Sequence, residues 1–134
     1  IKDDEYRRAI DYLSTRPEID INRLGMMGLS MGGLITFEVT AVDDRIKSAV
    51  AGVTPISKKP EFQSVEPTTF ASRIKSESFL MFMGNKDRLY TIDDALLLFD
   101  RIPTKQKDFV EYDYGHQPPV EYIKLVTDWF LTQL

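Results

Sequence analysis

The 134-residue sequence contains no cysteine and a single histidine. The missing thiols exclude disulfide bonds and thiolate metal sites, and one imidazole excludes zinc sites built from several histidines. We therefore expect no metal ion and no cofactor. Any chemistry that needs an imidazole must use His116.

Positive charge and long apolar runs are scarce as well. The formal net charge is -4, the pI is about 5.0, and the lysines and arginines are scattered along the chain. Such a protein does not attract phosphate backbones, so nucleic acid is not an expected partner. No apolar run approaches the roughly 18 residues of a membrane span, and the start IKDDEYRR lacks the apolar centre of a signal peptide. We expect no membrane partner and a cytoplasmic location.

The length and the order of the apolar segments indicate one α/β domain. Four short apolar runs alternate with helical periodicities, which predicts a parallel sheet of about four strands with flanking helices. The expected strands are residues 24–29, 46–53, 79–83 and 108–112, and the expected helices are residues 3–13, 31–42, 91–102 and 120–134. A helical turn is expected at residues 70–74. The composition, 43% hydrophobic and 28% charged, suits a single compact domain over residues 1–134.

The segment GLSMGG, residues 28–33, places a G-x-S-x-G pattern between an expected strand and an expected helix. A nucleophile elbow needs this turn, because its central residue is strained and small neighbours two before and two after it avoid a collision. Gly28 and Gly32 supply that room, with Gly33 beside them. The pattern predicts Ser30 as a nucleophile. The alternative is a helix start at which the glycines only allow strand and helix to pack.

A serine nucleophile requires a base, and His116 is the one imidazole available. It follows the fourth expected strand, while Ser30 follows the first, so parallel strands bring both to one edge of the sheet. Asp87 follows the third strand and is the first candidate to orient the imidazole. Asp113 is the second candidate because it lies close to His116 in the chain. The alternatives are a surface histidine and an ordinary turn aspartate.

A family resemblance rests on the chain order Ser30, Asp87 and His116, with each residue directly after a strand. It also rests on the segments RLGMMGLSMGG, GNKD and GH. The sequence resembles the α/β-hydrolase fold, especially its dienelactone hydrolase, acetyl esterase and prolyl-oligopeptidase-like branches. This resemblance implies that Ser30 is the nucleophile, His116 the general base and Asp87 the orienting acid. It also implies that the amide of Met31 is one donor of the oxyanion hole.

The resemblance covers only the later part of that fold. Members normally carry about four more strands before the elbow strand, and a loop among them donates the second oxyanion amide. We therefore expect the sequence to be the carboxyl-terminal half of an α/β-hydrolase domain. The outer edge of strand 24–29 then has no partner. A preceding segment of a longer chain or a second copy of this one is expected to cover it.

The last expected helix has a wide apolar surface. Because sequential right-handed crossovers place the other helices on one face of the sheet, this helix alone must cover the opposite face. Its expected stripe is Val120, Ile123, Val126, Phe130 and Leu134, broadened by Tyr122, Leu125 and Trp129.

Three functions remain open from the sequence. The leading one is a serine hydrolase that forms an acyl-enzyme with a small-molecule carboxylic ester. The second is a non-catalytic or weakly active fragment whose strand edge pairs with a partner chain. The third is a prolyl-oligopeptidase-like peptidase, which has the same motifs. The stretch 57–70 is expected either to border the acyl pocket through Phe62, Val65 or Phe70, or to be a surface loop.

Overall fold

The structure is a computed structural model that describes residues 3–134. Four parallel strands form one sheet in the order β1-β2-β3-β4, which confirms the expected α/β architecture. The helices and strands are α1 (Asp3–Ser14), β1 (Gly25–Leu29), α2 (Met31–Val42), β2 (Ser48–Gly52), α3 (Pro67–Ala71), β3 (Ser78–Gly84), α4 (Ile92–Asp100), β4 (Gln106–Tyr112) and α5 (Tyr122–Gln133). Two short 3-10 turns, η1 (Ile21–Arg23) and η2 (Pro60–Phe62), complete the chain.

The expected element boundaries hold within a few residues, and the differences have local causes. Helix α3 begins at Pro67, ahead of the turn expected at residues 70–74, because proline is well suited to the first turn of a helix. Helix α5 begins at Tyr122 instead of residue 120, so Pro118 and Pro119 lie in the preceding loop. The two 3-10 turns are too short to show a hydrophobic period, and the sequence did not predict them.

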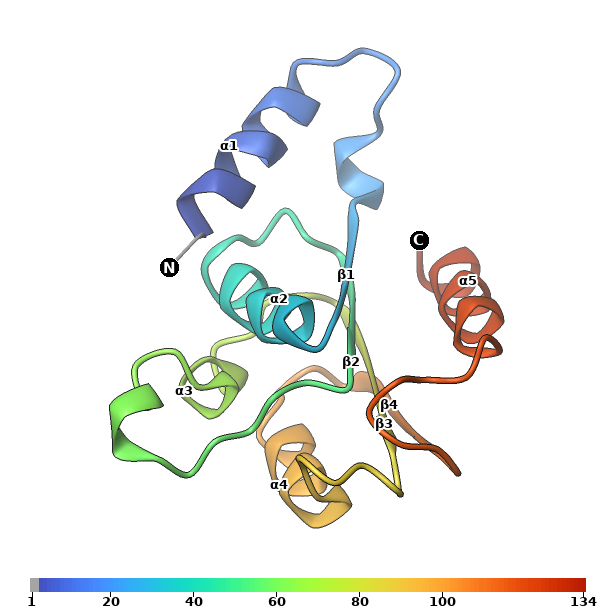
Figure 1. The fold of residues 1–134 in the computed structure, drawn as a ribbon. Helices are drawn as coiled ribbons and strands as arrows, with labels where there is room; N and C mark the ends of the chain where they lie inside the picture. The colour runs from blue at the N-terminus through green and yellow to red at the C-terminus, as the bar shows by residue number, and fades with distance from the viewer. Residues whose placement is uncertain (1–2) are drawn as a thin grey trace.

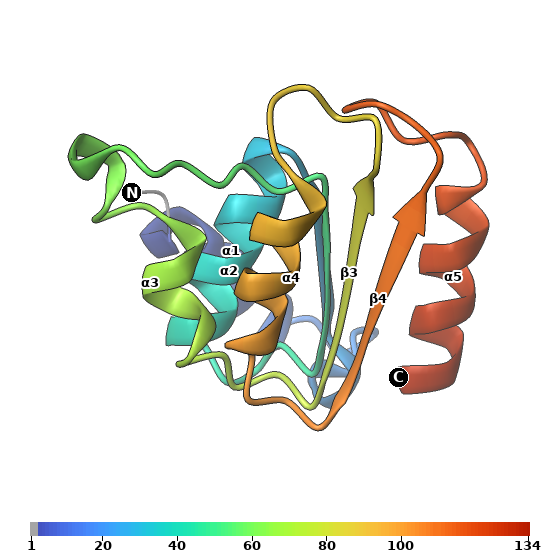
Figure 2. The ribbon, with the colours of Figure 1, turned by 90° about the horizontal axis from the view of Figure 1, so that it is seen from below.

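The sheet separates two layers of helices. Helices α1 to α4 lie on one face and α5 lies alone on the other, as sequential right-handed crossovers require (Figure 2). Strands β2 and β3 are buried along their whole length because both of their faces are covered. The larger core lies between the sheet and α1 to α4, where the rings of Phe37 and Phe79 meet at 5.0 Å.

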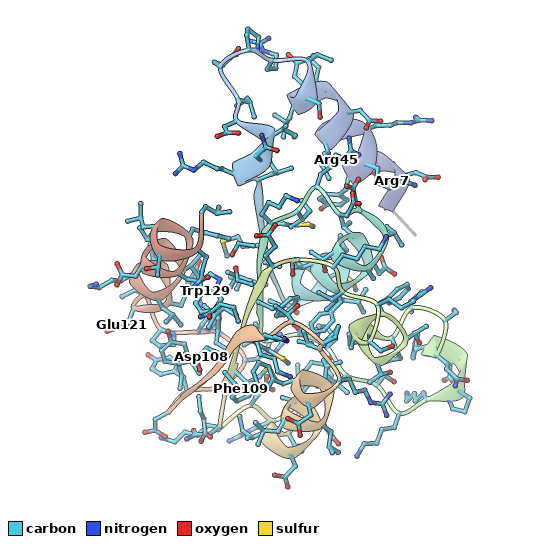
Figure 3. The ribbon with its side chains drawn as sticks, turned by 180° about the vertical axis from the view of Figure 1, so that it is seen from behind. Arg7, Arg45, Asp108, Phe109, Glu121 and Trp129 are labelled. Carbon is cyan, nitrogen blue, oxygen red and sulfur yellow. The ribbon has the colours of Figure 1, made fainter. Side chains whose placement is uncertain are left out.

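Helix α5 covers the second face of the sheet with only some of the side chains that were expected to be buried. The indole N–H of Trp129 donates to Ser48 Oγ at 3.0 Å, and Figure 3 shows this side chain between α5 and the strands. Val120 and Ile123, expected in the buried stripe, are 70% and 54% exposed. Apolar residues lie on more than one side of the helix, so the contact with the sheet selects which of them are covered. The side chains of α5 on this face are Tyr122, Leu125, Val126, Trp129 and Phe130, packed on Val50, Leu80 and Phe82.

The outer edge of β1 has no strand beside it in the described chain. Met27 on this edge is 40% exposed, and a hollow of about 250 Å³ lies between β1 and α1. Helix α1 is tied to the segment after α2 by Arg45, which contacts Asp11 at 2.6 Å, and by Arg7, which lies 3.7 Å from Asp43 (Figures 1 and 3). The expected open strand edge is therefore present in residues 3–134. In the same range, no helix is both long enough and apolar enough to cross a bilayer.

Candidate active site

Ser30 occupies the turn between the last residue of β1 and the first residue of α2. Its φ of 51° and ψ of -118° place an L-residue in a conformation that usually requires glycine. The Ser30 amide donates to the Gly52 carbonyl of β2 at 2.9 Å, and this bond to the neighbouring strand holds the turn. Backbone strain of this kind persists only where the surrounding structure fixes it, and it is typical of functional sites.

The glycines around Ser30 differ in what they do. A Cβ atom on Gly28 would lie 2.0 Å from the carbonyl oxygen of Gly32, so only glycine fits where strand and helix approach. A Cβ on Gly33 would lie 2.4 Å from the hydroxyl of Thr54, so Gly33 allows α2 to pack on the chain after β2. A Cβ on Gly32 would meet no described atom within 4 Å. The described residues therefore require glycine at Gly28, and none of them lies close enough to require it at Gly32.

The three residues singled out by the sequence meet at the carboxyl edge of the sheet. Ser30 Oγ lies 3.0 Å from His116 Nε2, and His116 Nδ1 lies 2.8 Å from Asp87 Oδ2. An ionised carboxylate only accepts hydrogen bonds, so the ring proton belongs on Nδ1 and Nε2 is left to accept from the serine hydroxyl. His116 stands between the other two side chains, as parallel strands predict.

Asp87 is fixed from the side opposite the imidazole. Its side chain is fully buried, and its second oxygen, Oδ1, accepts from the amides of Leu89 at 2.8 Å and Tyr90 at 3.4 Å. This leaves Oδ2 directed at His116. The second candidate, Asp113, is exposed and pairs with Lys86 at 3.0 Å instead. The geometry therefore favours Asp87 over Asp113.

Two further residues shape the site and were missed from the sequence. The ring of Tyr90 packs 5.8 Å from the imidazole of His116, between centroids, and borders it on one side. A Cβ on Gly84 would lie 2.3 Å from the carbonyl oxygens of Tyr114 and Gly115, so glycine is needed where the end of β3 meets the histidine loop. The sequence GNKD indicated only a turn here. An aromatic residue three positions after the acid matches no pattern that could have revealed Tyr90.

Met31 is the first residue of α2, and the first amides of a helix have no carbonyl partner within it. The Met31 amide therefore remains a donor beside Ser30, at the positive end of the helix dipole. Within residues 3–134 only α1 and η1 precede β1, so no counterpart of the loop that gives the second oxyanion donor lies there. The same residues contain no cluster of three or more histidine, aspartate or glutamate side chains that could hold a metal ion.

The profile of the dienelactone hydrolase family matches residues 1–114. The chain therefore belongs to the dienelactone hydrolase family. The matched range includes Ser30 and Asp87 and ends just before His116.

Solved structures show the same fold. A cold-adapted esterase from an Arctic intertidal metagenomic library superimposes with a TM-score of 0.81 at 25% identity, over 96% of this chain and 53% of its own. An acetyl xylan esterase from Paenibacillus sp. R4 gives 0.82 at 19% identity, over 95% of this chain and 50% of its own. Dipeptidyl peptidase 4 of Porphyromonas gingivalis gives 0.81 at 17% identity, over 99% of this chain and 23% of its own. The chain thus spans about half the length of the two esterases.

Proposed function

We propose that the protein is a serine hydrolase of carboxylic esters that works through an acyl-enzyme. The observation that carries this proposal is the continuous chain of contacts Ser30–His116–Asp87, built on a strained elbow. Ser30 Oγ attacks the ester carbonyl while His116 Nε2 takes its proton, and Asp87 stabilises the imidazolium that forms. His116 then gives the proton to the leaving alcohol. Water, activated by the same imidazole, hydrolyses the acyl-enzyme.

The Met31 amide supplies one hydrogen bond to the oxyanion of this reaction. Removing one oxyanion donor typically lowers the rate about 10²- to 10³-fold. We therefore propose that residues 1–134 alone turn over esters slowly, even though the nucleophile, base and acid are in place. Weak activity of this chain and full activity of a longer one are both consistent with the same site.

Esters are favoured over peptides as substrates by the family and by the two esterase structures. The peptidase fold is equally similar, and the Porphyromonas enzyme continues over a far larger chain. A peptide-bond hydrolase remains the second candidate function because the same three side chains serve either reaction.

A shallow groove of about 490 Å³ is the proposed acyl site. It is joined to the histidine through Tyr90, which lines the groove and packs on the His116 ring, whereas Ser30 and His116 themselves are not among its lining residues. Of the three side chains expected to border an acyl pocket, Phe62 lines this groove, and Phe70 packs on the edge of the larger core instead. Val65 is partly buried and does not line the groove. The groove walls are Ile56, Ser57, Lys58, Lys59, Phe62, Leu89, Tyr90 and Asp94.

Covalent labelling tests the proposed function. A fluorophosphonate is expected to add its phosphonyl group to Ser30 Oγ and lose fluoride, because the imidazole makes this hydroxyl nucleophilic. Intact-mass and peptide mass spectrometry of the 134-residue chain measure the adduct, and Ser30→Ala is the control that should not react. If the wild-type chain is not labelled at all, it is a non-catalytic fragment of the fold and the proposal fails.

We also propose that the open edge of β1 is covered by a preceding segment of a longer chain. The two esterase structures are about twice as long as this chain, and an uncovered edge beside exposed Met27 is prone to pair with another strand. In the 134-residue chain alone, a second copy would take that place.

The edge proposal predicts self-association of the isolated chain. Light scattering at about 10–100 µM should give a mass above that of one 15.4 kDa chain. Met27→Lys should restore the monomer, since a lysine on an edge strand opposes further pairing. Leu97→Lys is the matched control, because Leu97 is exposed on α4, away from β1 (Figure 1). A strictly monomeric wild-type chain would contradict the proposal.

A further inference from the structure

The segment between β2 and α3 leaves the sheet by an unusual turn. Val53, the residue directly after β2, is buried and has a φ of 45°, which is rare for a β-branched side chain. Its amide donates to the Phe82 carbonyl of β3 at 2.9 Å. From this turn, residues 54–66 lead away from the carboxyl edge of the sheet, on the face that carries α1 to α4, and continue into α3 (Figure 2).

Glu66 holds the far end of this segment. Its side chain is only 5% exposed, although a carboxylate is costly to bury. Glu66 Oε2 accepts from the Ser57 amide at 2.9 Å, and burial raises the pKa of this carboxyl. The hydrogen bond closes residues 57–66 into a loop and fixes the backbone next to Ile56 and Lys58.

The fixed backbone forms one wall of the groove that Tyr90 connects to the histidine. Ile56 and Phe62 belong to that wall, and Leu89 and Tyr90 belong to the wall opposite. The opposite wall is itself held by Asp87, which accepts from the Leu89 and Tyr90 amides. The two walls are therefore positioned by two buried carboxylates, one of which also contacts the imidazole.

A surface ion pair also joins the walls. Lys58 Nζ lies 2.9 Å from Asp94 Oδ1 at the start of α4. Lys58 is largely exposed, and exposed pairs contribute little to stability. Of these two contacts, the partly buried bond between Glu66 and the Ser57 amide is the better placed to fix the Ile56–Phe62 wall.

We propose that Glu66 is a positioning residue for acyl-chain selectivity. By holding the Ile56–Phe62 wall against Leu89 and Tyr90, it allows the groove to bind an aliphatic acyl group of about six carbons, whereas an acetyl group is too short to use it. This inference rests on the proposed ester hydrolysis at Ser30. Glu66 does not touch the reacting atoms, so its loss changes which acyl groups react.

The test compares two probes that label the same serine. The p-nitrophenyl esters of methylphosphonate and hexylphosphonate differ only in the alkyl chain, and each forms a bond from Ser30 Oγ to phosphorus while p-nitrophenolate leaves. The second-order labelling rate is followed by nitrophenolate release and confirmed by mass spectrometry. Wild type should prefer the hexyl probe about tenfold or more, the scale expected for a few methylenes in an apolar site.

Three variants separate the hydrogen bond from the charge. Glu66→Ala should lower the hexyl-to-methyl ratio about tenfold and leave methyl labelling within about twofold. Glu66→Gln should keep the wild-type ratio, because its amide oxygen still accepts from the Ser57 amide. Glu61→Ala removes an exposed carboxylate from the same loop and should change neither rate.

Phe62→Ala keeps the inference falsifiable if Glu66→Ala does not fold. Phe62 is exposed enough for its removal to spare the core, and the variant should lower the same ratio. An unchanged ratio in Phe62→Ala or in folded Glu66→Ala overturns the inference, as does a loss in Glu66→Gln equal to that in Glu66→Ala. If neither probe labels the wild-type chain, both the proposed function and this inference fail. If the wild type is labelled and every variant has the same hexyl-to-methyl ratio as the wild type, only the inference about Glu66 fails, and the proposed function stands.

Discussion

Asp87→Asn is expected to lower Ser30-dependent ester hydrolysis by about 10⁴-fold. In the proposed mechanism, the buried carboxylate of Asp87 keeps the imidazole proton on Nδ1 and stabilises the positive charge that develops during attack. An asparagine at this position accepts from the Leu89 amide equally well, but it can present an NH₂ group to His116 and favour the wrong tautomer. The rate of p-nitrophenyl acetate hydrolysis, with the Ser30→Ala rate subtracted, measures the effect.

Asp113→Asn is the matched control for that experiment. It makes the same chemical change three residues before His116, at an exposed carboxylate paired with Lys86. Its rate should stay within about twofold of wild type, since exposed ion pairs contribute little. Equal losses in the two variants would show that general charge near the site matters, and would refute the assignment of Asp87 as the orienting acid.

Gly28→Ala is expected to destroy the site and to lower the free energy of unfolding by more than about 3 kcal/mol. The added Cβ would lie 2.0 Å from a backbone carbonyl, which no side-chain rotation relieves, so strand and helix must separate. Forcing even flexible side chains apart costs about 1–3 kcal/mol. Urea denaturation and the phosphonate labelling rate at Ser30 measure the two losses.

Gly32→Ala provides the comparison for Gly28→Ala. Its Cβ would face open space, and Gly32 has no positive φ, so the variant should retain stability within about 1 kcal/mol and label normally. If Gly32→Ala lowered the unfolding free energy and the labelling rate as much as Gly28→Ala, the conclusion that the elbow requires glycine only at position 28 would be wrong.

The sequence alone determined the order of strands and helices, because that order follows from local periodicity. Apolar runs of strand length and helical spacing lie in the chain itself, and helix α2 was predicted at its observed bounds, Met31–Val42. The sequence also predicted that Ser30, Asp87 and His116 would meet, since each follows a strand and parallel strands end at one edge. Their catalytic roles remain a proposal until the serine is labelled.

Only the tertiary structure decided which surfaces make contact. Helix α5 has apolar residues on several sides, and packing on β2 and β3 selected Trp129 and left Ile123 exposed. Glu66 reads as an ordinary loop carboxylate, and its burial depends on the Ser57 amide nine residues away. Tyr90 borders His116 because the acid turn and the histidine loop are brought together by β3 and β4. These contacts join residues of different segments, so no helical or strand periodicity specifies them, and only the packed fold fixes their geometry.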